Sequence, residues 1–175
     1  MGLIRGVFDR LVLIVGVLAG GCIPGFIVQY QQRVGGRLDQ VRQDLLPFQE
    51  IARRYHGGDI QALVTHHLSS PDPSFQDEGH AIQGMLDSLA RLQSMVEGLT
   101  GSAWHQIAYL AGHFDREIGA ATWQSYVPTF SLDPAGLLVA GVFGVACWVL
   151  FIGIWFGVSR LADLIAIRVF SQSRY

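Results

Sequence analysis

Charged residues are scarce in this chain, and lysine is absent from it. The 175 residues include 14 acids and 12 basic residues, all arginine, so that 15% are charged, whereas a soluble domain carries about a quarter. The net charge of −2 comes without a basic patch, which excludes a nucleic-acid binder. Two runs lack charge entirely, 22 residues over 11–32 and 26 residues over 134–159. Because about 20 apolar residues cross a bilayer as a helix, an ordinary soluble globule is also excluded.

Cysteine is nearly absent, and the common catalytic motifs are missing. Cys22 and Cys147 both fall in the uncharged runs, so the segment between the runs has no disulfide to stabilise it. The sequence contains no phosphate-binding loop, GxSxG, CxxC or haem-attachment pattern. We therefore predict a protein without enzymatic activity and without a cofactor.

The first uncharged run has three interpretations. A retained transmembrane helix fits, because backbone groups inside a bilayer must bond one another. A cleaved signal peptide would also start with basic residues such as Arg5 and Arg10, but no A-x-A-like cleavage site follows. The stretch Ala19-Gly20-Gly21-Cys22 faintly resembles a lipobox, without the usual leucine three places before the cysteine. We favour the retained helix.

Charge and aromatic residues predict an orientation. The two ends outside the runs carry a net charge of +3, and residues 33–133 carry −5. Arginine-rich short flanks stay cytoplasmic, while long loops cross regardless of charge. Aromatic rings gather at membrane interfaces, and Tyr30, Trp123 and Tyr126 are expected at the outer one. The predicted segments are a cytoplasmic N-terminus (1–10), a transmembrane helix (11–32), an extracytoplasmic domain (33–133), a second transmembrane helix (134–159) and a cytoplasmic tail (160–175).

Small residues recur four positions apart in both uncharged runs. This spacing lets helix backbones approach closely, so it predicts helix packing, either between the two runs or between copies of the chain. The alternative is that glycine is simply common in membrane helices. The helix-packing positions are Gly16, Gly20, Gly21, Gly25, Gly136, Ala140, Gly144, Gly153 and Gly157.

Two narrow heptad stripes of apolar residues lie between the runs. The spacing alternates between three and four, which is typical of helices that pack along a seam, as in a coiled coil. The seam positions are Val34, Leu38, Val41 and Leu45 in the first stripe and Ile82, Met85, Leu89, Leu92, Val96 and Leu99 in the second. The sequence leaves open whether the stripes pair within one chain or between chains. Pro47 predicts a kink or a break in the first of these helices.

Turn and capping residues divide the rest of the central segment. His56-Gly57-Gly58-Asp59 predicts a helix end followed by a new N-cap, and Ser69–Pro73 predicts another boundary. Further helices are expected up to Gly112 and from Asp115 to about Trp123, and no strand pattern of comparable strength occurs. The predicted fold is all-α and integral to a membrane, with two transmembrane helices flanking an extracytoplasmic helical hairpin or bundle. The tail is expected to form an amphipathic helix at the inner membrane surface.

The histidines and acids are the candidate metal ligands. His66 and His67 are neighbours, which places them about 100° apart on a helix and prevents them from chelating one ion. Two loose groups remain, one around His113, Asp115 and Glu117 and one comprising Asp77, Glu78 and His80. Zinc requires three or four ligands at defined spacing, which neither group supplies. We therefore predict no metal.

Several short motifs resemble a bacterial membrane family catalogued as domain of unknown function 2937. They are Pro24-Gly25-Phe26, Gln29-Tyr30-Gln31-Gln32-Arg33, Gly36-Arg37-Leu38-Asp39 and Thr122-Trp123-Gln124-Ser125-Tyr126-Val127-Pro128. The resemblance covers essentially the whole chain and implies a Gram-negative inner-membrane protein with no assigned activity, so it transfers no catalytic residue. The Gln-Tyr-Gln-Gln-Arg and Trp-x-x-Tyr-x-Pro segments are its most specific parts, and we expect them to contact each other.

The expected function is that of a non-enzymatic inner-membrane protein. It would act as an accessory or scaffold subunit or as a homo-oligomer, with membrane lipid and membrane proteins as partners. An alternative is a periplasmic sensory module that acts through a separate polypeptide, since the tail is too short to hold an output domain. A metal-dependent periplasmic enzyme is the third interpretation.

Overall fold

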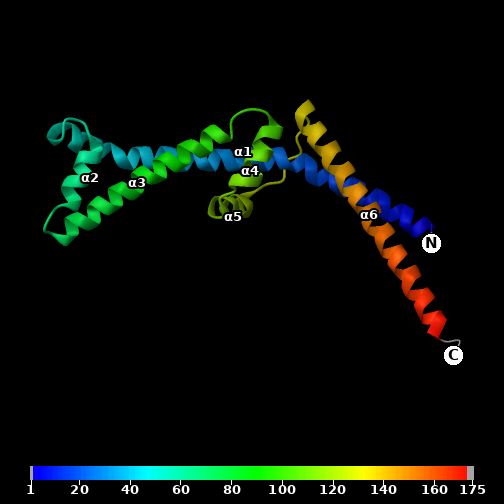
Figure 1. The fold of residues 1–175 in the computed structure, drawn as a ribbon. Helices are drawn as coiled ribbons and strands as arrows, with labels where there is room; N and C mark the ends of the chain where they lie inside the picture. Colours follow the sequence, from blue (N-terminus) through cyan, green and yellow to red (C-terminus); the bar gives the residue numbers. More distant parts are fainter. Residues whose placement is uncertain (1, 173–175) are drawn as a thin grey trace. The chain divides into compact units, whose positions relative to one another are not determined.

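Every regular element in the described part of the chain is a helix, which confirms the all-α prediction. The computed structural model describes residues 2–172, with side chains described over residues 5–160. The helices are α1 (Gly2–Tyr55), α2 (Ile60–Leu68), α3 (Pro73–Gly98), α4 (Ala103–His113), α5 (Arg116–Ser125) and α6 (Pro134–Gln172) (Figure 1). They belong to two compact units. The first comprises the chain up to Phe26 and from Val127 onward, and the second comprises Ile27–Tyr126.

Helix α1 joins the first uncharged run and the first heptad stripe in one uninterrupted element. The predicted break at Pro47 is wrong, because the helix continues for eight residues beyond it. A proline inside a helix costs about 3 kcal/mol. Leu45 and Ala52 on either side of Pro47 are fully buried, and their packing offsets this cost. The helix ends at Tyr55, before Gly57 and Gly58, whose φ angles of 61° and 90° lie in the region that favours glycine.

Aspartates begin three of the helices in the second unit, and the sequence indicates two of these starts, at Asp59 and at Asp115. Asp59 accepts a hydrogen bond from the Gln61 N–H at 2.8 Å, and Asp72 accepts one from the Ser74 N–H at 2.9 Å. Asp115 does the same for α5. These side chains satisfy backbone donors that a helix leaves unpaired in its first turn.

The two heptad stripes meet in the core of the second unit. Leu45 of α1, Val64 of α2 and Ile82 of α3 are completely buried against one another. Helix α3 lies alongside α1, and α2 lies across their ends (Figure 1). The other buried stripe residues are Val34, Leu38, Leu92 and Leu99, and the partly buried ones are Val41, Met85, Leu89 and Val96. The stripes therefore pair within one chain.

The two most apolar helices, α1 and α6, lie partly or wholly in the first unit. By length and composition, both Arg5–Tyr55 and Pro134–Arg160 could cross a membrane. Only 22% and 17% of their most apolar windows are buried, so most of their apolar side chains face outward. The helical backbone of α6 extends to Gln172, but the side chains that would make the tail amphipathic lie outside the described residues.

Candidate functional site

Small residues bring α1 and α6 into backbone contact in the first unit. A Cβ placed on Gly16 would lie 3.0 Å from the Gly144 Cα, and one placed on Gly20 would lie 3.1 Å from the Ala140 Cα. The residue numbers rise on one helix as they fall on the other, so the helices run antiparallel. Of the two pairings that the small-residue spacing allowed, the structure shows the one between the two apolar helices of the same chain.

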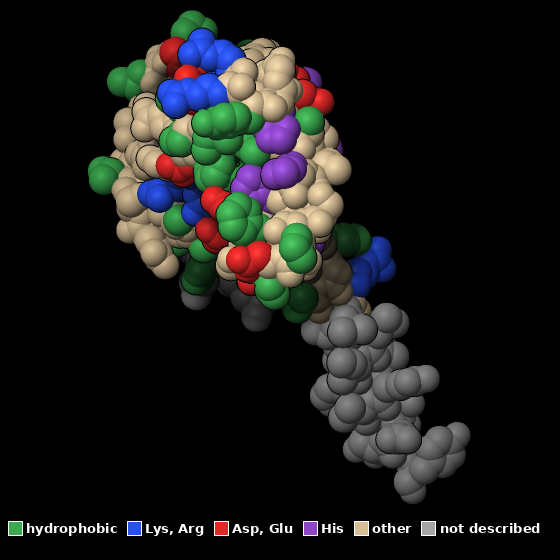
Figure 2. Space-filling model, turned by 90° about the vertical axis from the view of Figure 1, so that its left-hand side faces the viewer, with side chains coloured by type: hydrophobic (Ala, Val, Ile, Leu, Met, Phe, Trp, Pro, Cys, Tyr) green, Lys and Arg blue, Asp and Glu red, His purple; other side chains and the backbone are tan. Residues whose placement is uncertain are grey.

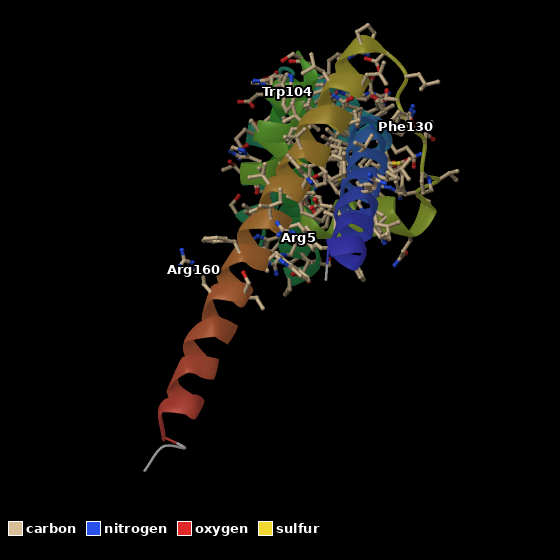
Figure 3. All side chains as sticks on the ribbon, turned by 90° about the vertical axis from the view of Figure 1, so that its right-hand side faces the viewer. Arg5, Trp104, Phe130 and Arg160 are labelled. Atoms are coloured by element: carbon tan, nitrogen blue, oxygen red, sulfur yellow. The ribbon has the colours of Figure 1, made fainter. Side chains whose placement is uncertain are left out.

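The segment between α5 and α6 closes over one end of this pair. The Phe130 ring lies directly on Gly21, where an added Cβ would overlap it (Figure 3). The Ser131 N–H donates to the Gly21 carbonyl oxygen at 3.0 Å. Asp133 caps α6 by accepting from the Ala135 and Gly136 N–H groups at 3.1 and 3.2 Å. Gly21 and Gly136 therefore make room for this segment rather than for a second helix.

The remaining predicted helix-packing positions include Gly153 and Gly157 on α6, which do not contact α1. A Cβ placed on Gly153 or on Gly157 would meet no atom within 4 Å, so that face of α6 is open over the part of the chain whose side chains are described. Gly25 is partly buried on α1. The open face is available to lipid or to another helix.

Tyr30 joins α1 to the start of α5 in the second unit. Its side chain is completely buried, its ring stacks on Phe114 with centroids 5.8 Å apart, and its hydroxyl oxygen accepts from the Asp115 N–H at 3.2 Å. Trp123 behaves differently, since it is 70% exposed and stacks on Tyr126. Of the three rings expected at an interface, Tyr30 is thus a core residue and Trp123 lies at the surface.

Asp115 is held by charge-assisted hydrogen bonds. Its carboxylate accepts from the backbone N–H of Ile118 at 3.0 Å, from that of Glu117 at 2.9 Å and from the Arg91 guanidinium at 2.6 Å. The Ile118 N–H, followed by the Arg91 guanidinium, holds the pKa of Asp115 below its ordinary value, although burial acts to raise it. A lowered pKa in the folded state stabilises the fold above the unfolded-state pKa, and this contribution is lost as the pH falls through the folded-state value.

We expect Asp115→Asn to lower the stability of the second unit by about 1–2 kcal/mol at pH 7, because asparagine still caps a helix but removes the charge that Arg91 pairs with. The thermal unfolding temperatures of the two chains should converge as the pH falls from about 4, the ordinary pKa of the carboxylate, through the lower folded-state pKa of Asp115. Asp77→Asn, at an exposed position on α3, is the control. A difference that stays constant from pH 7 to acid would contradict this explanation.

A polar groove of about 580 Å³ lies between α1 and α5 in the second unit. Its α1 wall consists of residues spaced three or four apart on one helix face, Gln29, Gln32, Arg33, Gly36, Arg37 and Gln40. Thr122 and Ser125 of α5 form the opposite wall. Arg33 donates to the Ser125 hydroxyl oxygen at 2.7 Å, and Arg37 pairs with Glu117 at 2.7 Å. We refer to the eight residues of the two walls as the arginine groove.

The match to a family model decides the family. The model of the family described as "Protein of unknown function (DUF2937)" matches residues 4–163. The chain belongs to the DUF2937 family. No curated protein and no solved structure shows significant similarity to it. Membership in DUF2937 supplies no activity, substrate or site residue.

The two most specific segments of the DUF2937 resemblance meet in the arginine groove. Gln29–Arg33 lies on one wall, and Thr122 and Ser125 of the Thr122–Pro128 segment lie on the other. The Arg33–Ser125 hydrogen bond joins them, so the expected contact is confirmed. The groove itself was not predicted. Arginine and glutamine at helical spacing are the only signal for it in the sequence, and a solvated helix face has the same pattern.

His56, His66 and His67 form a cluster of rings that was not predicted from the sequence. The His56 and His66 ring centroids lie 5.3 Å apart, and those of His66 and His67 lie 6.1 Å apart; Figure 2 shows histidines side by side on one surface of the molecule. His67 also approaches Glu78 at 3.5 Å, whereas the sequence grouped Glu78 with Asp77 and His80. Over the residues with described positions, no group of three or more His, Cys, Asp or Glu side chains is arranged to hold a metal ion.

Proposed function

We propose that this DUF2937 protein is a non-enzymatic inner-membrane protein of bacteria, which acts as an accessory or scaffold subunit or as a homo-oligomer. The observation that carries the proposal is the outward-facing apolar surface of α1 and α6, of which about four fifths remains unburied over the most apolar windows. Water disfavours so large an apolar surface, whereas lipid or another apolar helix would cover it.

Charge supports the proposed topology. In the antiparallel pair, Arg5 of α1 and Arg160 of α6 lie toward the same end, away from the segment that carries Phe130 (Figure 3). Arginine flanks favour the cytoplasmic side. Both termini are thus proposed to be cytoplasmic and the second unit periplasmic.

The open face of α6 supports assembly. Gly153 and Gly157 repeat the spacing by which Gly16 and Gly20 receive α6, but no described residue of the same chain covers them. The hollow lined by Leu138, Val142, Val145 and Val149 on α6 is also apolar and open. A second copy or a partner's helix would find room there, with dispersion between closely spaced backbones as the attractive force.

One experiment on the full chain tests topology and assembly together. Cys22 and Cys147 are replaced by serine, a single cysteine is introduced by Ser70→Cys, and intact cells are treated with a membrane-impermeant thiol reagent. We expect labelling at this position and none in the matched Ser171→Cys chain near the other end.

After extraction in mild detergent, the labelled protein should have a mass above that of one 19.2 kDa chain, as an oligomer or with a co-purifying protein. A monodisperse, unaccompanied monomer would overturn the scaffold proposal, and labelling of Ser171→Cys alone would overturn the topology.

A second candidate is a periplasmic sensory module that acts through a separate polypeptide. The arginine groove favours it, since a sensor requires a ligand-sized polar site in the second unit. Binding of a soluble ligand in this groove would support the sensor over the scaffold.

A further inference from the structure

We propose that the arginine groove binds a phosphate-bearing anion, as a phospholipid headgroup or as a soluble phosphate. Its charges are unevenly compensated. The Arg37 guanidinium has a carboxylate partner, Glu117. The Arg33 guanidinium donates instead to a neutral hydroxyl, and among the described residues no carboxylate lies within 4.0 Å of it. The groove therefore keeps an uncompensated positive charge.

The donors in the groove suit a phosphate group. A guanidinium presents a planar fork of N–H donors that matches two oxygens of one phosphate, and each glutamine amide adds N–H donors. Ser125 also donates toward the carbonyl oxygens of Ala121 and Thr122, so its oxygen is turned to accept from Arg33 and holds that guanidinium in place. A carboxylate has two acceptor oxygens, whereas a phosphate group has at least three, so a phosphate has more acceptors for the donors of Arg33 and the flanking glutamines.

A glycine leaves space for the ligand. Gly36 lies on the groove wall between Arg33 and Arg37, and a Cβ placed on it would meet no atom within 4 Å. A larger side chain there would enter the groove without disturbing the packing. Gly35 is equally open but is not part of the groove, so it provides a matched control.

The position of the groove favours a lipid headgroup. Gln29 and Gln32 fall at the end of the first uncharged run, and Trp123, 70% exposed, follows Thr122 on the opposite wall. Exposed tryptophan beside arginine is typical of the headgroup layer. A phospholipid headgroup can be the ligand only if the membrane insertion proposed above is correct. Binding of inorganic phosphate does not depend on that insertion.

The experiment uses the full chain in mild detergent. Binding of dioleoyl-phosphatidylglycerol is followed by native mass spectrometry, and stabilisation by inorganic phosphate is followed by thermal unfolding. Arg33→Gln should weaken phosphate binding about 10-fold or more, because it removes a charge-assisted hydrogen bond. Gly36→Leu should weaken it to a similar extent for a different reason, since the added side chain would occupy the groove. Arg42→Gln and Gly35→Leu should bind as the wild type does, since Arg42 pairs with Asp39 outside the groove. Helical circular dichroism confirms that each variant is folded.

The two sources give different results. If phosphatidylglycerol binding depends on Arg33 and Gly36 while inorganic phosphate has no effect at millimolar concentration, the ligand is a headgroup. If inorganic phosphate stabilises the chain through the same residues, the ligand is soluble. That second result would support this inference even if the thiol labelling showed no membrane topology. Equal binding of both probes by the wild type, Arg33→Gln and Gly36→Leu would overturn it.

Discussion

Gly16→Cys, in a chain whose Cys22 is serine, is expected to form an intramolecular disulfide with Cys147 almost completely under mild oxidation. A Cβ at position 16 would lie 3.1 Å from the Cys147 Cβ. Disulfides join Cβ atoms about 3.5–4.5 Å apart, so a separation of the helices by a few tenths of an ångström suffices. The measurement is the intact mass, which should show the loss of two hydrogens from one chain, together with a count of free thiols.

The control for this cross-link is Gly6→Cys on the same helix, where no atom lies within 4 Å of the added Cβ. It should keep both thiols free under the same conditions. A dimer linked through position 16 would mean that the glycine stripe of α1 joins two copies rather than α1 and α6 of one chain. Free thiols at both positions would mean that the helices do not pack at this register.

Leu45→Ala is expected to lower the free energy of unfolding of the second unit by about 2–5 kcal/mol, because it leaves a cavity where Leu45, Val64 and Ile82 meet. Since small domains are stable by only about 5–15 kcal/mol, this would remove a large part of the total. Denaturant unfolding of the full chain in mild detergent, followed by far-ultraviolet circular dichroism, measures the loss.

The same substitution one residue later is the matched control. Leu46 is 59% exposed, and Leu46→Ala should change the free energy of unfolding by no more than about 0.5 kcal/mol. If the two variants lost equal stability, the two stripes would not be packed as the structure places them.

The elements could be predicted from sequence because their signals are local. Asp59 and Asp72 cap the helices they precede, since a cap depends on residues only two or three positions away. The heptad stripes were visible for a similar reason, as burial on one helix face imposes its period on the sequence. The prediction of a break at Pro47 was wrong because the free-energy cost of a proline inside a helix is local. The packing of Leu45 against Ile82 of α3, which outweighs that cost, involves a residue far away along the chain.

The candidate site was harder to predict because its parts come together only in three dimensions. Gly16 and Gly144 both stood out as small residues, but only the fold shows that they face each other. Arg33 and Ser125 are 92 positions apart, and nothing local to either residue indicates a groove. The neighbouring rings of His56 and His66 likewise come from two helices joined by a turn, and the sequence drew attention only to the adjacent pair His66 and His67.

The antiparallel contact between α1 and α6 has a consequence for biosynthesis. Gly16 and Gly144 are 128 positions apart, so the contact closes a very long loop, and it forms only after most of the chain has been translated. Helices α2 to α5 emerge earlier and can condense onto α1 first, which shortens the effective loop and reduces the entropy lost on closure. During that interval the nascent α1 keeps its small-residue face uncovered.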